Sequence, residues 1–243
     1  MKLSRRLKAI ANLIGPQPAQ VWDCCCDHGY LGAALLSRGH KVHFVDVVAD
    51  ITDALTVKLN QFFAVEDKQS PPWTVHCIDV AQLPLANYPT KRPVIIVIAG
   101  IGGELMRDLL LDLQPVLNQL NAAISLILCP VNHAYLVRAF LSEQVYYCDN
   151  ELLIEENKRF YEIMHITTQP NRQNQGYRVS KVGRKIWQSS HLPANLQDIA
   201  KRYHCKLISH YQRQLIGANK AADVIEQQRL QTILSAYGDV TLD

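Results

Sequence analysis

The sequence lacks an apolar segment long enough to cross a membrane. Its longest apolar runs, 94–99 and 124–129, are far shorter than the ~20 residues that a membrane-spanning helix needs. The N-terminal region also lacks the uninterrupted apolar stretch of a signal peptide. We therefore expect a globular protein of the cytoplasm, with no membrane partner.

The sequence also lacks a C-x-x-C spacing, although it has seven cysteines. Structural zinc sites need cysteine or histidine pairs roughly two to four residues apart, with a second pair downstream. An odd number of cysteines that includes a consecutive triplet at 24–26 does not suit a disulfide framework either. We therefore expect reduced thiols that pack as small core residues, and no metal site.

The charge is unevenly distributed along the 243 residues, although the formal net charge is only +3. Residues 1–169 carry 14 basic and 17 acidic side chains, whereas residues 172–220 carry 10 basic side chains and only Asp198 as an acid. Residues 221–243 return to a net charge of −3. A concentrated basic segment is typical of a part that binds nucleic acid, and the alternative is a solvated helical face.

Strand and helix patterns alternate over the first 145 residues. Because parallel strands need crossover connections, this alternation predicts an α/β protein with a mostly parallel, doubly wound sheet. The strands are expected at 20–25, 42–46, 73–78, 94–99 and 124–129, and the helices at 4–14, 29–38, 50–64, 104–113 and 133–143.

The pattern changes after residue 145. Two strand patterns, 146–155 and 160–167, predict a hairpin that adds to the sheet edge in antiparallel orientation. A polar stretch at 169–176 then leads into helical patterns, which divides the chain into a domain at 1–169 and an appendage at 176–243. Apolar residues at steps of three or four predict two helices there, joined by a turn at 217–219 and packed as an antiparallel hairpin.

Two strand-to-helix turns carry the residues most typical of a ligand site. The first is V-W-D-C-C-C-D-H-G-Y-L at 21–31, and the second is I-I-V-I-A-G-I-G-G-E at 95–104. Ligands of open α/β sheets bind beyond the carboxyl ends of the strands, so we expect the turns to share one cleft. A nicotinamide site is disfavoured, because the G-x-G-x-x-G fingerprint would need a glycine where Leu105 stands.

Four motifs occur in order along the chain: D-H-G-Y-L at 27–31, I-A-G-I-G-G at 98–103, L-I-L-C-P-V-N at 126–132 and Y-E-I at 161–163. On these motifs the chain resembles the TrmK family over nearly its whole length. These are bacterial tRNA adenine-N1 methyltransferases that use S-adenosylmethionine and modify adenine 22. The resemblance implies a Rossmann-like class I methyltransferase fold, a C-terminal coiled-coil-like helical hairpin, S-adenosylmethionine as cofactor and tRNA as partner.

The resemblance also implies which residues meet the cofactor. Asp23 would organise the loop at the methionine part, Asp46 would accept the ribose hydroxyl hydrogens, and Asp79 would contact the adenine amino group. Each acid has an alternative role as a strand-end residue that caps the following turn. The full set of expected cofactor residues is Asp23, Cys25, Gly29, Asp46, Asp79, Ala99 and Gly100.

The expected catalytic residues are Asp27, His28, Tyr30 and Asn132. Adenine N1 has a lone pair at neutral pH, so the enzyme must expose the base and aim it, and a carboxylate such as Asp27 stabilises the cation that alkylation creates. Tyr30 would stack on the base or hydrogen-bond to it, and His28 would position either the base or the cofactor. The alternative makes Asp27 a helix N-cap and Tyr30 a core aromatic.

RNA contacts are expected from basic residues of the N-terminal helix and of the basic segment, with the hairpin leaving the protein a monomer or a weak dimer. These residues are Arg5, Arg6, Arg178, Lys181, Arg184, Lys185, Lys201, Arg202 and Lys206.

The chain departs from the family pattern at Cys25, Gly32 and Cys129, where glycine, proline and glutamine are common. If position 25 requires a positive φ, the Cβ of Cys25 costs roughly 1 to 2 kcal/mol. The competing hypothesis is therefore a degenerate methyltransferase fold that binds RNA or protein and has lost the cofactor.

Overall fold

One eight-stranded sheet with the order β3-β2-β1-β4-β5-β7-β6-β8 forms the centre of the protein. The computed structural model describes residues 3–63, 71–119, 124–144, 146–168, 176–188 and 194–242. The strands are β1 (Gln20–Cys24), β2 (Lys41–Asp46), β3 (Trp73–Cys77), β4 (Val94–Ala99), β5 (Ile124–Cys129), β6 (Tyr147–Glu156), β7 (Arg159–Thr167) and β8 (Tyr177–Arg178).

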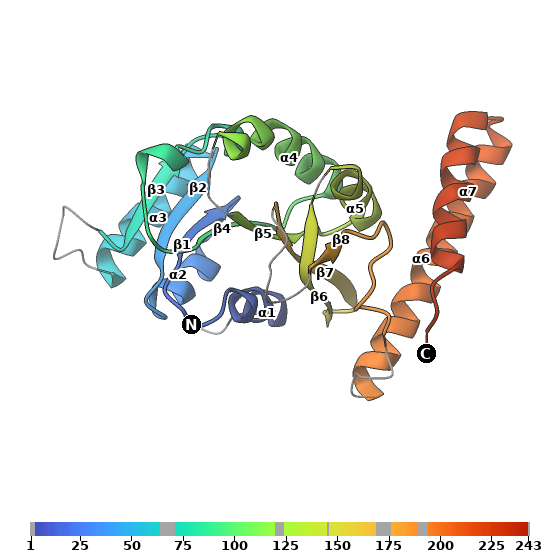
Figure 1. The fold of residues 1–243 in the computed structure, drawn as a ribbon, viewed down its shortest axis with the longest axis horizontal. Helices are drawn as coiled ribbons and strands as arrows, with labels where there is room; N and C mark the ends of the chain where they lie inside the picture. Colours follow the sequence, from blue (N-terminus) through green and yellow to red (C-terminus); the bar gives the residue numbers. More distant parts are fainter. Residues whose placement is uncertain are drawn as a thin grey trace.

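Helices cover both faces of this sheet, and a helical pair lies beyond its β8 edge (Figure 1). The helices are α1 (Arg5–Ile14), α2 (Tyr30–Leu36), α3 (Ala49–Phe62), α4 (Gly103–Asn118), α5 (Ala134–Glu143), α6 (Ala194–Lys220) and α7 (Val224–Gly238). Two 3-10 helices, η1 (Val80–Gln82) and η2 (Leu85–Asn87), follow β3.

The five strands from β1 to β5 are parallel, as the alternating pattern predicts. The chain builds β1, β2 and β3 outward in one direction and then returns to place β4 on the other side of β1. The order of strands therefore reverses between β1 and β4, which is where open α/β sheets bind their ligands. Asp23 of β1 pairs with Val97 of β4, so the turns that follow these strands are neighbours.

Two apolar cores form on the two faces of the sheet. Met106 and Leu110 of α4 pack with Val137 of α5 on one face, and Ile10 of α1 packs with Leu35 of α2 on the other. The parallel strands are rich in apolar residues, and β4 is apolar over its full length, because helices cover both faces of the sheet. This explains why the sequence pattern locates them well.

The predicted hairpin is confirmed. β6 and β7 are antiparallel, and β7 also pairs antiparallel with β5. Its two turn residues, Asn157 and Lys158, have φ of 51° and 61°, the conformation of a type I′ turn. The two-residue strand β8 pairs outside β6 and forms the sheet edge, a strand that the sequence did not predict.

The C-terminal segment forms the predicted pair of helices, but the predicted turn at 217–219 is wrong. Helix α6 continues through Gly217 to Lys220, and the chain reverses at Ala222, whose φ is 53°. Asp223 then caps α7 by accepting a hydrogen bond from the amide of Glu226. Of the predicted polar stretch at 169–176, residues 169–175 lie outside the described residues.

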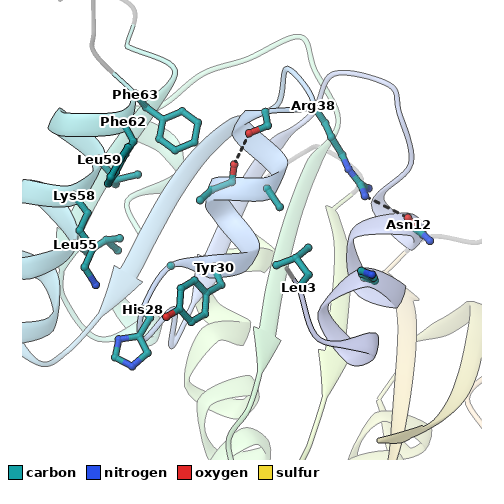
Figure 2. Close-up of a pocket in the computed structure, with 15 residues that line it drawn as sticks. Leu3, Asn12, His28, Tyr30, Arg38, Leu55, Lys58, Leu59, Phe62 and Phe63 are labelled. Carbon is teal, nitrogen blue, oxygen red and sulfur yellow. Dashed lines mark hydrogen bonds between the residues drawn. The ribbon is translucent and has the colours of Figure 1, made fainter. Parts of the chain in front are cut away.

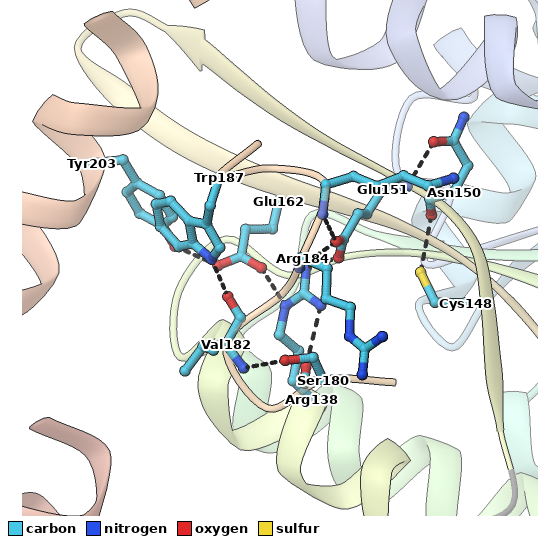
Figure 3. Close-up of polar contacts among 11 residues, drawn as sticks. Arg138, Cys148, Asn150, Glu151, Glu162, Ser180, Val182, Arg184, Trp187 and Tyr203 are labelled. Atoms are coloured by element: carbon cyan, nitrogen blue, oxygen red, sulfur yellow. Dashed lines mark hydrogen bonds and ion pairs between the residues drawn. The ribbon is translucent and has the colours of Figure 1, made fainter. Parts of the chain in front are cut away.

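A buried polar network joins this helical pair to the sheet (Figure 3). The Arg138 guanidinium of α5 lies between two carboxylates, 2.5 Å from Glu162 Oε2 and 2.7 Å from Glu151 Oε2. The Tyr203 hydroxyl of α6 donates to the other oxygen of Glu162, and the amide of Arg184 donates to Glu151. Removing one partner from such a network leaves a buried group unsatisfied, so the network specifies how α6 docks.

Within the described residues, no helix combines the length and the apolar content that crossing a lipid bilayer requires.

Candidate functional site

The turn after β1 has left-handed backbone at three alternate positions. Cys25, Asp27 and Gly29 have φ of 55°, 47° and 68°, and these are the three glycine places of the methyltransferase turn. The expected strain at Cys25 is therefore present, because a Cβ disfavours this conformation. Gly29 is the N-cap of α2 and no side chain caps this helix, so the interpretation of Asp27 as a helix cap is wrong.

Asp23 is buried beneath this turn. Its Oδ2 accepts a hydrogen bond of 2.9 Å from the amide of Gly32 in the first turn of α2. Burial raises the pKa of the Asp23 carboxyl to about 7, although the Gly32 amide opposes the shift. A Cβ at Gly32 would lie 2.1 Å from the Phe44 ring, so this packing excludes the proline that the family commonly has there.

Asp46 supports the same turn from the end of β2. Its two carboxylate oxygens accept hydrogen bonds from the amides of Asp27 and Val48 at 3.2 Å and 3.1 Å. A carboxylate has about four lone-pair positions, so Asp46 can accept further hydrogens from a ligand. Asp79 caps η1 by accepting a hydrogen bond of 2.8 Å from the amide of Ala81. This is the alternative role expected for this acid, capping the turn after the strand.

The structure brings these acids together around Cys25. Burial raises the pKa of the Cys25 thiol to about 11, and the charges of Asp46, Asp23 and Asp79 add to the shift. The thiol is therefore protonated at neutral pH and is a poor nucleophile. Cys25 packs against the core on the α4 side of the sheet and Cys26 against the core on the other side. The turn thus presents negative charge, with its sulfur atoms partly withdrawn into the two cores.

The turns after β4 and β5 form the neighbouring wall. Gly100 has a φ of 92° and donates its amide to the carbonyl of Cys129 at the end of β5. The Asn132 side chain accepts a hydrogen bond of 3.1 Å from the amide of Gly103. A Cβ at Gly103 would lie 2.6 Å from the carbonyl oxygen of His133, so glycine is required there. These contacts join Asn132 to residues 102 and 103 of the turn that begins at the predicted Ala99 and Gly100.

His28 and Tyr30 project from the start of α2. Tyr30 is 47% exposed, so the interpretation of Tyr30 as a core aromatic is wrong. The His28 and Tyr30 rings lie 5.5 Å apart, and His28 Nδ1 is 3.7 Å from Asp27 Oδ1. An exposed acid, imidazole and phenol thus lie next to each other at the mouth of the turn.

A cavity of about 1240 Å³ begins at these residues and runs along α2, between α1 and α3. Figure 2 shows His28 and Tyr30 at one end and Phe62 and Phe63 at the other. The cavity shares Gly29 with the turn after β1, whereas Asp23, Asp46 and Asp79 are not among its lining residues. Sequence reasoning missed this cavity, because Leu55 and Leu59 of its lining have the spacing of ordinary core residues and are buried, and Phe62 is the exposed apolar side chain beside them.

Several of the predicted RNA-binding residues already have partners in the protein. The Arg202 guanidinium contacts both oxygens of Glu155 at 2.6 Å and Asp198 at 2.7 Å. Lys181 lies 3.7 Å from Glu143. The pairs of Arg178 with Tyr147 and of Lys206 with Phe160 are cation–π contacts, which leave the charged head available to a ligand. Arg184 and Lys185 contact the Tyr177 ring in the same way, and Lys201 is exposed.

Arg5 and Arg6, the two residues of α1 that are predicted to bind RNA, lie in different environments. Arg6 lies 4.9 Å from the centre of the Tyr161 ring, and its guanidinium is about 4 Å from the position that a Cβ of Gly100 would take. Its charge also acts on the buried thiol of Cys129. Arg6 therefore reaches the floor of the site, whereas the Arg5 side chain is at the surface and its amide donates to Glu156.

Comparisons with known proteins agree with this architecture. A Mycoplasma pneumoniae protein named "Putative tRNA methyltransferase" is 28% identical over 166 residues, which are 68% of this chain and 71% of that protein. The crystal structure of the B. subtilis m1A22 tRNA methyltransferase TrmK has a TM-score of 0.73 and 22% identity, covering 100% of this chain and 99% of that one.

The structure of M. capricolum TrmK with S-adenosyl-homocysteine has a TM-score of 0.68 and 16% identity, covering 99% and 100% of the two chains. At these identities the structural likeness establishes the fold, which is the predicted Rossmann-like fold with antiparallel strands at one edge and C-terminal helices. The profile of the family described as "Methyltransferase domain" matches residues 3–164, which is more than half of the sequence. The chain therefore belongs to the methyltransferase domain family.

Proposed function

We propose that this protein transfers the methyl group of S-adenosylmethionine to N1 of an adenine in tRNA, at position 22. The observation that carries the proposal is the left-handed turn at Cys25, Asp27 and Gly29, with carboxylates gathered around it at the point where the strand order reverses. Relatives named as tRNA methyltransferases, and a neighbour with the product S-adenosyl-homocysteine bound, support the substrate and the cofactor.

The acids suit this cofactor because its sulfonium is cationic and its ribose has two hydroxyl donors. Asp46 would accept the ribose hydroxyls, and Asp79 would accept from the adenine amino group with the oxygen that does not cap η1. Asp23 would act indirectly, since it holds the first turn of α2 in place. Cys25, Gly29, Ala99 and Gly100 would present backbone to the cofactor, because two of these are glycines with positive φ and a third has the same conformation.

The target base must leave its stack in the tRNA before N1 can reach the methyl group. Tyr30 offers an exposed ring for stacking, and His28 lies beside it. Asp27 is exposed at the mouth of the turn and would stabilise the positive charge that develops on the ring. Asn132 would hold the base from the opposite wall, next to the Gly100 turn.

Under this proposal, residues 1–169 carry out the methyl transfer and residues 176–243 bind the RNA. The density of cations supports this, because phosphate contacts dominate affinity for nucleic acids. Arg5, Arg178, Arg184, Lys185, Lys201 and Lys206 would contribute these contacts more than Arg202 and Lys181, whose charges are paired.

The Asp27→Asn variant tests the chemistry. Asparagine tolerates left-handed backbone, so the variant removes the charge and keeps the turn. Its methylation rate should fall roughly 100-fold or more, as on loss of one transition-state charge contact. Mass spectrometry of nucleosides from the treated tRNA would measure 1-methyladenosine, and calorimetry would measure S-adenosylmethionine affinity, which should change little.

The exposed Asp53 of α3 provides the matched control, since Asp53→Asn removes the same charge away from the turn. Equal rates for the two variants would remove Asp27 from the mechanism. If the unmodified protein gives no heat with S-adenosylmethionine and no methylated tRNA, the protein is a binding protein with a degenerate site, which is the competing hypothesis.

A further inference from the structure

A second concavity lies where helix α6 meets the sheet. It has a volume of about 370 Å³ and we call it the junction pocket. One wall is the segment that follows β5, which includes Asn132 and His133, and another is Phe160 of β7. The third wall is α6, with Lys206, His210 and Arg213 among its residues. Residues 1–169, which we call the body, and the helical tail, which consists of α6 and α7, therefore build this pocket together.

Basic side chains dominate its polar lining. Lys206, His210, Arg213 and His133 line the pocket, and Glu162 is the acid among the lining residues. Glu162 is 1% exposed, and its two oxygens accept from Arg138 and from Tyr203. Burial and the nearby charges of His133, Arg213 and Lys206 all lower the pKa of His210. These basic groups are thus close enough to repel each other.

Lys206 and Arg213 are the two fixed positive charges of the pocket. Both side chains are exposed, and neither forms an ion pair with a carboxylate in the part of the chain that the structure describes. This differs from Arg202, one turn earlier on the same helix, which is neutralised by Glu155 and Asp198. His133 contacts the Glu104 carboxylate and is therefore not counted among these fixed, unpaired cations. Lys206 and Arg213 therefore remain available to an anion.

The location of the pocket and the aromatic side chains that line it indicate which anion it would bind. Its lining shares Asn132 with the site described above, and Asn132 is bonded to Gly103 in the turn after β4. The Phe160, Tyr203 and Tyr211 rings complete the lining, and Lys206 Nζ is 5.2 Å from the centre of the Phe160 ring. Cations over aromatic rings in a concave site suit a phosphate that carries a sugar and a base.

We propose that the junction pocket binds a backbone phosphate of the RNA substrate next to the adenine that is methylated. The helical tail then completes the site beside the reacting base, in addition to gripping the RNA elsewhere. The proposal rests on the proposed function, since tRNA is the ligand.

The test compares three single substitutions on α6 that each remove one positive charge. Lys206→Gln and Arg213→Gln change the pocket, and Lys220→Gln changes an exposed lysine at the far end of the helix. The dissociation constant for tRNA is measured by fluorescence anisotropy over a range of salt concentrations. Both pocket variants should bind several-fold more weakly, with a salt slope smaller by about 1, whereas Lys220→Gln should resemble the unmodified protein.

Calorimetry with S-adenosylmethionine and thermal denaturation should give unchanged values for all three variants, because the side chains are exposed and belong to α6 and not to the acidic turn. If the unmodified protein methylates tRNA and the pocket variants match Lys220→Gln in affinity and salt slope, the junction pocket is overturned and the proposed function stands. If the unmodified protein neither binds nor methylates tRNA, both proposals fail.

Discussion

At the scale of single residues, the turn after β1 keeps the backbone of a glycine-rich turn without most of its glycines. Cys25 and Asp27 both have positive φ, and only Gly29 retains the residue that suits this conformation. The sequence predicted that Cys25 stands at a glycine position of this turn and would be strained there, because the spacing from Asp23 identifies the three glycine positions. It could not predict that Asp46 supports the turn through the amide of Asp27, since that contact depends on the register of β1 and β2.

Substitutions at Cys25 should reveal this strain as a difference between two variants. Cys25→Ala and Cys25→Gly both lose the thiol, but only the glycine variant loses the Cβ. The free energy of unfolding should therefore be roughly 1 kcal/mol higher for Cys25→Gly than for Cys25→Ala, as measured by urea denaturation. At an ordinary φ the order would be reversed, because glycine costs more conformational entropy than alanine. An alanine variant that is the more stable of the two would contradict the left-handed backbone.

At the scale of helices and strands, the sequence predicted the parallel strands to within a residue or two. These strands are short segments rich in apolar residues, and this signal needs no tertiary information. Helix ends were less predictable. Helix α4 runs through Pro115 to Asn118, past the expected end at 113, and α6 runs through Gly217. In both helices the proline or glycine is a local signal for a boundary, and packing against neighbouring helices outweighs it.

Gly217→Ala tests the revised end of α6. A Cβ at Gly217 would meet no atom within 4 Å, and the residue lies inside the helix. The substitution should therefore raise the free energy of unfolding by about 1 kcal/mol, the helix propensity difference between alanine and glycine. Ala222→Gly, at the actual reversal with its φ of 53°, should also be stabilising. Destabilisation by Gly217→Ala in chemical denaturation would instead favour a turn at 217–219.

At the scale of the whole molecule, the helical tail and the sheet share one buried cluster. Tyr135 of α5, Trp187 and Tyr203 pack together with Leu230 and Tyr237 of α7. The sequence predicted that a helical appendage exists, and it did not predict how it docks. Nothing in the local spacing of Arg138, Glu151 and Glu162 indicates that these side chains meet, although Glu162 belongs to the Y-E-I motif. Their burial depends on contacts between residues 13 to 41 positions apart.

This shared cluster should make the body and the tail unfold in one calorimetric transition, and Tyr203→Phe should lower its midpoint. The variant leaves an oxygen of the buried Glu162 without its donor, at a cost of roughly 1 to 3 kcal/mol. Tyr237→Phe is the matched control. The Tyr237 hydroxyl is buried and has no hydrogen-bond partner among the described residues, so its loss should leave stability unchanged or improve it. Two resolved transitions, or equal effects of the two variants, would contradict this coupling.

The buried network also sets an order of events during synthesis. When β7 leaves the ribosome, Glu162 has Arg138 as a partner, but Tyr203 follows 41 residues later. The backbone donors for Glu151, at Arg184 and Lys185, come 33 and 34 residues after it. Until these segments emerge, both carboxylates are better solvated by water than buried. We therefore expect the β6–β7 edge of the sheet to close in the nascent chain only after α6 has emerged.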